Sequence, residues 1–425
     1  MSAAVSARTA LVVGGSVAGL FTAHLLRAAG WTVTVVERAR DDLAGRGAGI
    51  GTRPELFAVL RRIGIELNET QGVVPVRSRK YIGTIGETTH ELALPSINSA
   101  WDRIYRPLRD AMPAGSLRAG VALEQVLSNG SRVQVQLSDG SRVQADLLVG
   151  ADGVYSTVRR ELFPEAQSVY TGYVAWRGVL DEADMPSSVH EQLFHHMSFS
   201  VVDGAEARRP ANELFLCMPM PGRDDDVREG HRRFHFIWFR TVDFERELPA
   251  LCTDATGKRH GVSIPPPLIR PEVIADLREQ ARATLPPPLA ALVERVPQPL
   301  LQPIYDLECP RLAVGRAALV GDAGFVARPH VATGVTKAAL DAQCLADSLA
   351  AAGNDIEAGL AAYNRIRQPL GRSLVARARS LGAYLESGAR ARDPQVRQAA
   401  REHRPAEAIL AEYGAAGSIH EAGLR

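Results

Sequence analysis

Residues 9–37 have the order strand, glycine turn, helix and strand, with an acidic residue at the end. An apolar run, 10–13, is followed by Gly14-Gly15-Ser16-Val17-Ala18-Gly19, and helical spacing then continues to Gly30. A second apolar run, 31–36, ends in Glu37. This is the order of the first unit of a dinucleotide-binding fold. The start of the chain is therefore predicted to form a Rossmann-like, parallel α/β structure.

The glycine turn has the residue types that a nucleotide pyrophosphate requires. Gly14 permits a tight turn, and a small residue at position 16 lets backbone N–H groups approach an anion at the positive end of a helix. Ser16 stands where the G-x-G-x-x-G pattern has its middle glycine, so the turn alone is equally consistent with an ordinary tight turn. Glu37 follows Gly14 by 23 residues. A carboxylate there accepts hydrogen bonds from ribose hydroxyls, which favours FAD or NAD over a 2′-phosphorylated nucleotide.

Composition excludes several other classes of protein. The 425 residues are 46% hydrophobic and 23% charged, which is typical of a globular chain of two to three domains at about 150 residues each. The 49 basic and 48 acidic residues balance, so we expect no nucleic-acid or membrane partner. Four cysteines without a C-x-x-C pair predict neither a disulfide framework nor a metal site, and they favour a cytoplasmic location. Glycines interrupt the uncharged stretch 9–26, unlike a signal peptide or a membrane span.

Two later segments carry an aspartate at the end of an apolar run. Residues 147–153 end in Ala151-Asp152-Gly153, and residues 317–323 end in Gly321-Asp322-Ala323. An Asp-Gly turn after a strand is common, so each segment alone is unremarkable. Asp322 is placed to hold a polyol chain, and a helix after Gly334 would direct its N-terminal amides at a flavin carbonyl. Together, in this order and spacing, the three segments are specific for the binding of one dinucleotide-type cofactor.

The three motifs, 14–19, 150–153 and 321–323, resemble the FAD motifs of the single-component flavoprotein aromatic hydroxylases, the para-hydroxybenzoate hydroxylase class. The resemblance extends over about 9–385. Residues 172–178 and 328–338 are most similar to the 2,6-dihydroxypyridine 3-hydroxylase branch. The resemblance implies a non-covalent FAD, NADH or NADPH as a transient reductant, and O2 as co-substrate. Two departures are Phe325, where many relatives carry histidine, and Ala332, where many carry glycine.

The strand-like segments in the middle of the chain predict a division into domains, and the resemblance implies a set of cofactor contacts. We predict an α/β fold in which 1–75, 96–168 and 301–385 form a discontinuous, Rossmann-like FAD-binding domain. An antiparallel sheet domain for substrate, 76–95 and 169–300, is inserted into it, and 386–425 forms a C-terminal helical tail. Arg106 would contact the FAD phosphates, Asp152 would serve FAD and the pyridine nucleotide, and Asp322 would bind the ribityl chain. The predicted FAD-binding residues are Gly14, Gly15, Ser16, Val17, Ala18, Gly19, Glu37, Arg38, Gly49, Arg106, Val126, Asp152, Gly321, Asp322 and Gly334.

In this class a flavin hydroperoxide delivers its distal oxygen to an electron-rich ring, and loss of a ring proton raises the reactivity of that ring. His330, directly after Pro329, is predicted to be the base or proton relay, and a loop histidine held by a backbone group is the equally weighted alternative. Tyr173 and Arg177 are predicted to hold a ring oxygen, against a purely structural role in a strand. The predicted catalytic residues are His330, Pro329, Arg177 and Tyr173, and the predicted substrate contacts are Tyr173, Arg177, His196, Trp238 and His330.

The leading functional hypothesis is hydroxylation of a small hydroxypyridine- or pyridone-type heteroaromatic. One alternative is the same chemistry on a phenolic or polyketide-derived ring in natural-product tailoring. A remoter alternative is a flavin reductase or dehydrogenase that inserts no oxygen. A flavin halogenase is excluded because the chain has no Trp-x-Trp-x-Ile-Pro stretch. A homo-oligomer, with the C-terminal helix at a subunit interface, is compatible with this reading.

Overall fold

Strands β1 (Thr9–Val13) and β2 (Thr32–Glu37) lie side by side and parallel, and helix α1 (Val17–Ala28) connects them as the glycine turn predicts. The computed structural model describes residues 8–44, 49–67, 70–203, 212–261, 263–353 and 355–414. Gly30, with φ of 85°, follows α1 and turns the chain back into β2. The predicted βαβ unit is therefore confirmed.

This unit belongs to a six-stranded sheet that is parallel except at one edge. Its order is β18-β19-β12-β1-β2-β8, with β18 antiparallel to β19. The second and third predicted motifs end the neighbouring strands β12 and β19, which pair with each other. All three motifs therefore meet at one edge of the sheet. The further strands are β8 (Leu117–Ala119), β12 (Leu147–Gly150), β18 (Ala313–Val314) and β19 (Ala317–Leu319).

Two small three-stranded sheets accompany the parallel sheet. One has the order β11-β10-β9 and the other β3-β7-β4. Strand β3, which follows the glycine unit, pairs with β7 and brings Gly51 opposite Asn98. The strands are β9 (Leu123–Asn129), β10 (Val133–Leu137), β11 (Arg142–Ala145), β3 (Gly49–Gly51), β7 (Ser96–Ala100) and β4 (Val74–Val76).

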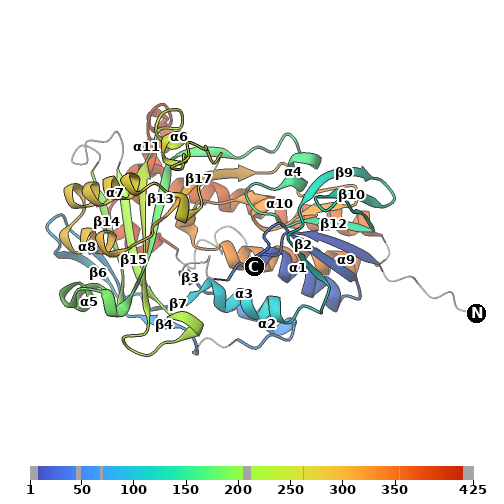
Figure 1. Cartoon of the computed structure of the whole chain (residues 1–425), viewed down its shortest axis with the longest axis horizontal. Coiled ribbons are helices and arrows are strands. Elements are labelled where there is room, and N and C mark those ends of the chain that lie inside the picture. Colours follow the sequence, from blue (N-terminus) through green and yellow to red (C-terminus); the bar gives the residue numbers. More distant parts are fainter. Residues whose placement is uncertain are drawn as a thin grey trace, which may run out of the picture.

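An eight-stranded sheet forms the other end of the molecule (Figure 1). Its order is β20-β17-β13-β16-β15-β14-β5-β6, and its pairs are antiparallel except β5 and β14, which are parallel. Its strands are β5 (Ser78–Ile82), β6 (Thr88–Leu92), β13 (Val169–Asp181), β14 (His196–Val202), β15 (Glu213–Met220), β16 (Arg233–Thr241), β17 (Leu300–Glu308) and β20 (Phe325–Val326). The prediction of a wholly antiparallel sheet is corrected at that pair, because 76–95 is a hairpin added from another part of the chain. Strands β17 and β20 also extend this sheet beyond residue 300, into residues that the sequence had assigned to the FAD-binding part.

Both faces of the eight-stranded sheet are covered. One face carries a cluster of buried residues that includes Phe234, Phe236 and Trp238 and packs against α7 and α8. The other face carries a second cluster, with Tyr173, Ile237 and others, that faces the C-terminal segment. This two-sided burial decides which side chains of β16 can meet a ligand.

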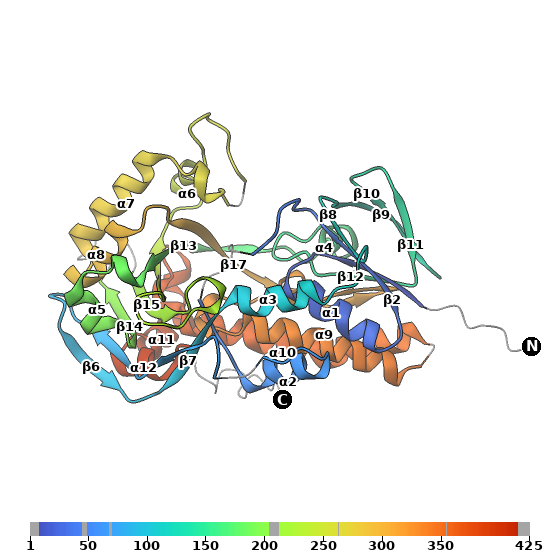
Figure 2. The same cartoon turned by 60° about the horizontal axis from the view of Figure 1, so that its bottom comes forward.

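The helices flank both large sheets. Helices α9 and α10 lie side by side along the parallel sheet, with α1 against α9 (Figure 2), whereas α7, α8 and α12 lie beside the eight-stranded sheet. The helices are α2 (Pro54–Arg62), α3 (Trp101–Asp110), α4 (Thr157–Leu162), α5 (Ser187–Leu193), α6 (Glu247–Leu251), α7 (Pro271–Thr284), α8 (Pro287–Arg295), α9 (Gly334–Ala351), α10 (Ile356–Leu381), α11 (Pro394–His403) and α12 (Ala406–Glu412). Within the part of the chain that the structure describes, no helix has the length and apolar character needed to cross a membrane.

The described part of the C-terminal tail, 386–414, contains two α-helices, α11 and α12, rather than the single helix expected. Helix α12 packs beside β5 and β6 of its own chain, and Ile409, Leu410 and Tyr413 join the buried cluster on that face of the sheet. Arg79 on β5 donates hydrogen bonds to the carbonyl oxygens of Leu410 and Tyr413, both at 2.8 Å. The tail thereby becomes part of the substrate side of the molecule.

Candidate functional site

Two positions of the glycine turn, Gly14 and Gly19, have no room for a side chain. Gly14 has φ of 112°, and a Cβ there would lie 2.3 Å from the carbonyl oxygen of Ala151. A Cβ on Gly19 would lie 1.8 Å from the carbonyl oxygen of Gly14. Helix α1 begins directly after Ser16, whose side chain makes no capping hydrogen bond. The first backbone N–H groups of α1 are thus available at the positive end of a helix dipole, as an anion-binding turn requires.

Glu37 lies beside this turn, at the end of β2. Its Oε2 accepts a hydrogen bond from the N–H of Gly15 at 2.7 Å, and its Oε1 accepts one from the N–H of Ala39 at 2.8 Å. These two bonds hold the carboxylate at the position predicted for a ribose, and each oxygen keeps a further lone pair for a hydroxyl donor. Arg38, the next predicted cofactor contact, is exposed beside it.

Asp152 follows β12 and caps the short helix α4. Its Oδ2 accepts hydrogen bonds from the N–H groups of Thr157, at 2.6 Å, and Val158, at 3.3 Å. Its other oxygen accepts from the hydroxyl of Ser156. Burial raises the pKa of Asp152, although these hydrogen bonds oppose that effect. The carboxylate therefore shapes the turn, and its predicted contact with two nucleotides stays a prediction.

The second and third motifs are joined by one side chain. Arg159 of α4 donates from Nη1 to the carbonyl oxygen of Ala323 at 2.9 Å. Gly321, with φ of 60°, approaches α1 so closely that a Cβ would lie 2.9 Å from the Cβ of Ala18. These contacts hold Asp322 next to the glycine turn.

Asp322 and Gly334 line a cavity of about 820 Å³. The Asp322 side chain is 48% exposed, and its carboxylate forms an ion pair with Nζ of the buried Lys337 at 2.7 Å. Helix α9 begins at Gly334, and a Cβ built there would meet no atom within 4 Å. The loop before it contains Ala332 in the left-handed region, with φ of 47°, which explains why glycine is the easier residue at this position. The amides at the start of α9 thus face open space in the cavity, which fits a bound flavin.

Three further predicted cofactor residues are placed differently from one another. Gly49 of β3 lines the cavity. Arg106 of α3 is partly exposed, forms an ion pair with Asp224, and does not line the cavity. Val126 lies in β9, where its N–H donates to Glu161 at 3.3 Å. Of the three, the structure brings only Gly49 to the cavity.

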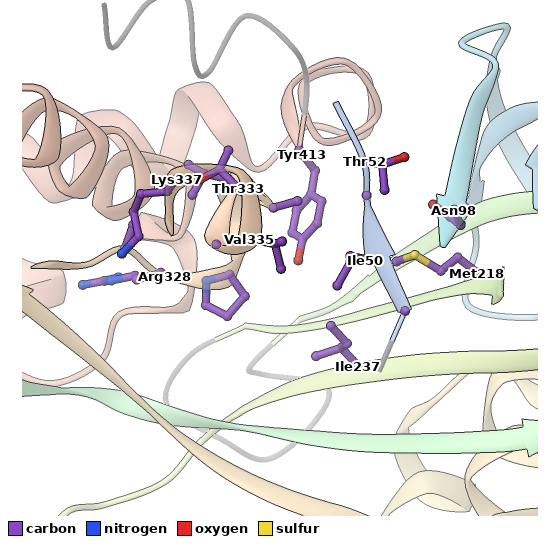
Figure 3. Close-up of a pocket in the computed structure, with 18 of the residues that line it drawn as sticks. Ile50, Thr52, Asn98, Met218, Ile237, Arg328, Thr333, Val335, Lys337 and Tyr413 are labelled. Carbon is purple, nitrogen blue, oxygen red and sulfur yellow. The ribbon is translucent and has the colours of Figure 1, made fainter. Parts of the chain in front are cut away.

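The far side of the cavity is formed by the inner face of the eight-stranded sheet, with Met218 and Ile237, and by the small β3-β7-β4 sheet, with Ile50 and Asn98. Figure 3 shows these residues opposite Thr333, Val335 and Lys337 at the start of α9, with Tyr413 between the two sides. Arg177 of β13 also lines this face, and it pairs across the sheet with Ile237. An aromatic ring between these sides would have apolar contacts on one face and polar groups at its edge.

His330 and Tyr173 lie behind the cavity rather than on its surface. The Tyr173 hydroxyl and His330 Nε2 are 2.9 Å apart. Neither is among the cavity-lining residues, whereas Pro329 is. Burial, followed by the charge of Arg328, lowers the pKa of His330 to about 3. The imidazole is therefore neutral at working pH, and its position favours the structural alternative over direct proton abstraction.

Trp238 and His196 point away from the cavity. Trp238 is buried in the cluster on the opposite face of β16, with Arg240 stacked on its ring at 4.3 Å. Nδ1 of His196 on β14 lies 2.7 Å from the hydroxyl of Ser78. Their neighbours in sequence, Ile237 and Met197, line the cavity instead. Because side chains alternate along a strand, a predicted contact that is off by one residue lies on the face of the sheet opposite the cavity.

His235 and Tyr413 are among the cavity-lining residues that sequence reasoning missed. His235 lies two positions before Ile237 on β16, so strict alternation is a signal that could have found it. Tyr413 comes from the C-terminal tail, and no local pattern indicates that this tail returns to the cavity. Gly414 extends the same wall, and its N–H donates to the carbonyl oxygen of His330 at 2.9 Å.

Comparisons with known proteins agree with this arrangement. The chain matches the FAD binding domain family over residues 7–234, more than half of its length, and the FAD binding domain-like family over residues 170–306. It is 29% identical over 378 residues to 2,6-dihydroxypyridine 3-monooxygenase of Paenarthrobacter nicotinovorans, covering 89% of this chain and 91% of that protein. It is 27% identical over 356 residues to 6-hydroxynicotinate 3-monooxygenase of Bordetella bronchiseptica, covering 79% and 80% of the two chains.

The fold agrees as well. The solved structure of 2,6-dihydroxypyridine-3-hydroxylase from Arthrobacter nicotinovorans superposes with a TM-score of 0.81 at 27% identity, covering 92% of this chain and 96% of that one. The resemblance inferred from the three motifs, and the FAD that it implies, are thereby confirmed.

Proposed function

Because the chain belongs to the family of FAD-dependent aromatic monooxygenases, we propose that it hydroxylates a hydroxypyridine- or pyridone-type ring with NADH or NADPH as reductant and O2 as oxidant. The observation that carries this proposal is a single cavity lined from two sides. Asp322 and Gly334 line it from the FAD motifs, and Arg177 and Ile237 line it from the sheet. A small aromatic ring held between these sides would lie next to a bound flavin.

The cofactor side of the cavity has a role for each predicted group. The glycine turn and the start of α1 would bind the pyrophosphate, and Glu37 would bind the ribose. Asp322 would accept hydrogen bonds from the ribityl hydroxyls, with Lys337 fixing its orientation at 2.7 Å. The amides at the start of α9 would stabilise negative charge on the flavin ring. When bound and reduced, FAD supplies the oxygen-activating chemistry that the protein side chains lack.

The substrate side would orient the ring and exclude water. Met218, Ile237 and Ile50 supply apolar contact area, and Arg177 supplies a cation at the edge. Tyr413 and Gly414 close the wall, with the Gly414 carbonyl oxygen held by Arg53 at 3.0 Å. Water has to be excluded because, in a water-filled site, the activated oxygen would be lost in a side reaction before it reaches the ring.

The pyridine-type substrate rests on the names of the relatives, which act on 2,6-dihydroxypyridine and 6-hydroxynicotinate. The test is oxidation of NADH and NADPH by the FAD-loaded protein, with and without a panel of hydroxypyridines and phenols, followed by product mass. We expect a hydroxypyridine to accelerate oxidation and to gain one oxygen atom. If only phenols accelerate oxidation of the reductant, the substrate is a phenolic ring rather than a hydroxypyridine. Reductant consumption with no oxygen in any product would overturn the hydroxylase assignment in favour of a reductase.

A further inference from the structure

A buried histidine that the proposed mechanism does not use faces the cavity. His235 of β16 is 0% exposed. It lines the cavity, and neither ring nitrogen has a hydrogen-bond partner among the described residues. A buried imidazole without partners costs about 1–3 kcal/mol in unmet hydrogen bonds. A ligand group that reaches one of these nitrogens would remove that cost.

Arg177 lies beside His235 on the same face of the sheet. Arg177 pairs with Ile237 across β13 and β16, and His235 pairs with Val179, so the two side chains are diagonal neighbours. Arg177 also lines the cavity, and its Nε is buried without a hydrogen-bond partner. No carboxylate in the described ranges forms an ion pair with it. Two nitrogen-bearing groups without internal partners therefore converge on one part of the cavity.

The charges around the cavity are unbalanced in favour of cations. The basic side chains that line it are Arg53, Arg79, Arg177, Arg328 and Lys337, while the single acidic lining residue of the described chain is Asp322. Asp322 is already paired with Lys337, and Arg328 is paired with Asp306 and Glu386 at 2.8 and 2.6 Å. Arg79 is engaged by the tail carbonyls. Arg177 is the cation of this set with no anionic or carbonyl partner in the described structure.

Resting on the proposed function, we propose that Arg177 and His235 together bind one anionic oxygen substituent of the aromatic substrate. That oxygen is a ring oxygen that has lost its proton, or an oxygen of a ring carboxylate. Met218, directly opposite His235 on β15, and Ile237 then hold the ring itself. Guanidinium and imidazole N–H groups are strong donors to anionic oxygen, and a site built around such an oxygen rejects an analogue that lacks it.

The two groups divide the task. Burial, followed by the charges of Arg177 and Arg233, lowers the pKa of His235 to about 3, so it donates an N–H as a neutral ring. Arg177 alone supplies the charge. The other titratable or charged groups near the pair are Arg233 on the same strand as His235 and Tyr413 of the tail, and Tyr413 in turn lies near Arg79 on β5. A substrate bound as its anion has released its proton to solvent, so no protein base has to take that proton inside the cavity.

The test measures binding and ionisation without turnover. Purified holoenzyme with oxidised FAD is titrated with 2,6-dihydroxypyridine, nicotinate and 2,6-dimethoxypyridine, and binding is read from the flavin difference spectrum. We expect the dimethoxy compound, which has no ionisable oxygen, to bind at least about tenfold more weakly than the best anionic probe. Of the two anionic probes, the tighter binder identifies a ring oxygen or a carboxylate as the natural group. Equal affinity of all three compounds would overturn the proposal.

Variants assign the effect to the pair. Arg177→Gln is expected to remove the preference for anionic probes and to return the pKa of bound 2,6-dihydroxypyridine, lowered by about one unit in the wild type, to its value in solution. Arg177→Lys is expected to restore part of both effects. His235→Phe, which keeps an aromatic volume, should weaken anionic probes by about tenfold and leave 2,6-dimethoxypyridine unaffected.

Arg372→Gln is the matched control. It removes the same charge from an arginine that is 69% exposed on α10, and the preference should be unchanged. If Arg177→Gln keeps the wild-type preference, the assignment is wrong. Because these titrations need no reductant, they separate the two proposals. Anionic probes that bind through Arg177 but never stimulate NAD(P)H oxidation would leave this inference standing and refute hydroxylation.

Discussion

The hydroxyl of Tyr173 and Nε2 of His330 are 2.9 Å apart, and both side chains are fully buried. Tyr173 belongs to the eight-stranded sheet, whereas His330 belongs to the loop that precedes α9. Phe239 and Tyr413 pack on the imidazole, with ring centroids at 4.9 and 5.7 Å. The contact therefore fixes the loop before α9 relative to the sheet, and with it the two sides of the cavity.

Tyr173→Phe tests that role. The change keeps the ring but leaves Nε2 of His330 without a partner, so we expect the free energy of unfolding to fall by about 1–2 kcal/mol. Turnover should also fall, because the loop at the start of α9 loses one constraint. Urea unfolding and steady-state kinetics measure the two effects. Tyr170→Phe is the control, since its hydroxyl donates to the Val242 carbonyl oxygen at 3.0 Å, away from this loop. It should lower stability to a similar extent with turnover unchanged.

His330→Gln separates a positioning residue from a base. The sequence is consistent with His330 as either a base or proton relay or a structural loop residue. The pKa of about 3 implies that His330 does not ionise between pH 5 and 9. We expect kcat to fall at every pH while the shape of the pH–rate profile stays that of the wild type. A limb of the profile that disappears in the variant would restore the catalytic assignment.

Low pH should destabilise the protein, over a pH range set by the pKa values of its buried, neutral histidines. His235 and His330 have pKa values near 3 in the folded state, against about 6.5 when unfolded. Between these values the unfolded chain binds protons that the folded chain excludes, so the free energy of unfolding falls as pH decreases from about 6.5. His330→Gln should show a shallower decrease than the wild type between pH 6.5 and 4.5. Identical slopes in denaturant unfolding would contradict the assigned pKa.

Asp322→Ala is expected to purify with little FAD. The change removes the acceptor for the ribityl hydroxyls and leaves the buried Lys337 without its ion pair. Asp322→Asn keeps an oxygen acceptor and should retain more flavin than the alanine variant. The ratio of flavin to protein absorbance measures the result. Full flavin content in Asp322→Ala would refute its cofactor role.

Neighbouring residues of β16 should have opposite phenotypes. Trp238→Phe trims a side chain in the cluster beneath the sheet and should lower the free energy of unfolding by about 1–3 kcal/mol, with KM for the aromatic substrate unchanged. Ile237→Phe enlarges a residue of the cavity wall and should raise KM with little loss of stability. A raised KM in Trp238→Phe would show that the tryptophan reaches the substrate after all.

Much of the cofactor side could be predicted from the sequence, because its signals are local. The turn itself requires Gly14, because of its φ of 112°, and Gly19, because a Cβ there would clash with the Gly14 carbonyl oxygen, and Glu37 follows at the end of the next strand. The apolar runs before Asp152 and Asp322 form parallel strands of one sheet, which brings their ends together. Few folds are compatible with glycines at positions where a Cβ would clash, together with apolar runs of strand length at this spacing. The α/β class, the βαβ unit and the FAD cofactor follow from these features.

The substrate side was decided by tertiary structure. Alternation along β16 shows that Trp238 and Ile237 face opposite ways, but both faces of this sheet are buried, so hydrophobicity does not identify the face that lines the cavity. His330 is adjacent to Pro329 in sequence, yet only the packing of Tyr173, Phe239 and Tyr413 turns it away from the cavity. The parallel pair β5–β14 and the return of Tyr413 from the tail join segments distant in sequence. Such contacts depend on which surfaces meet after the strands have formed, and that information is spread over the whole chain rather than held in any one motif.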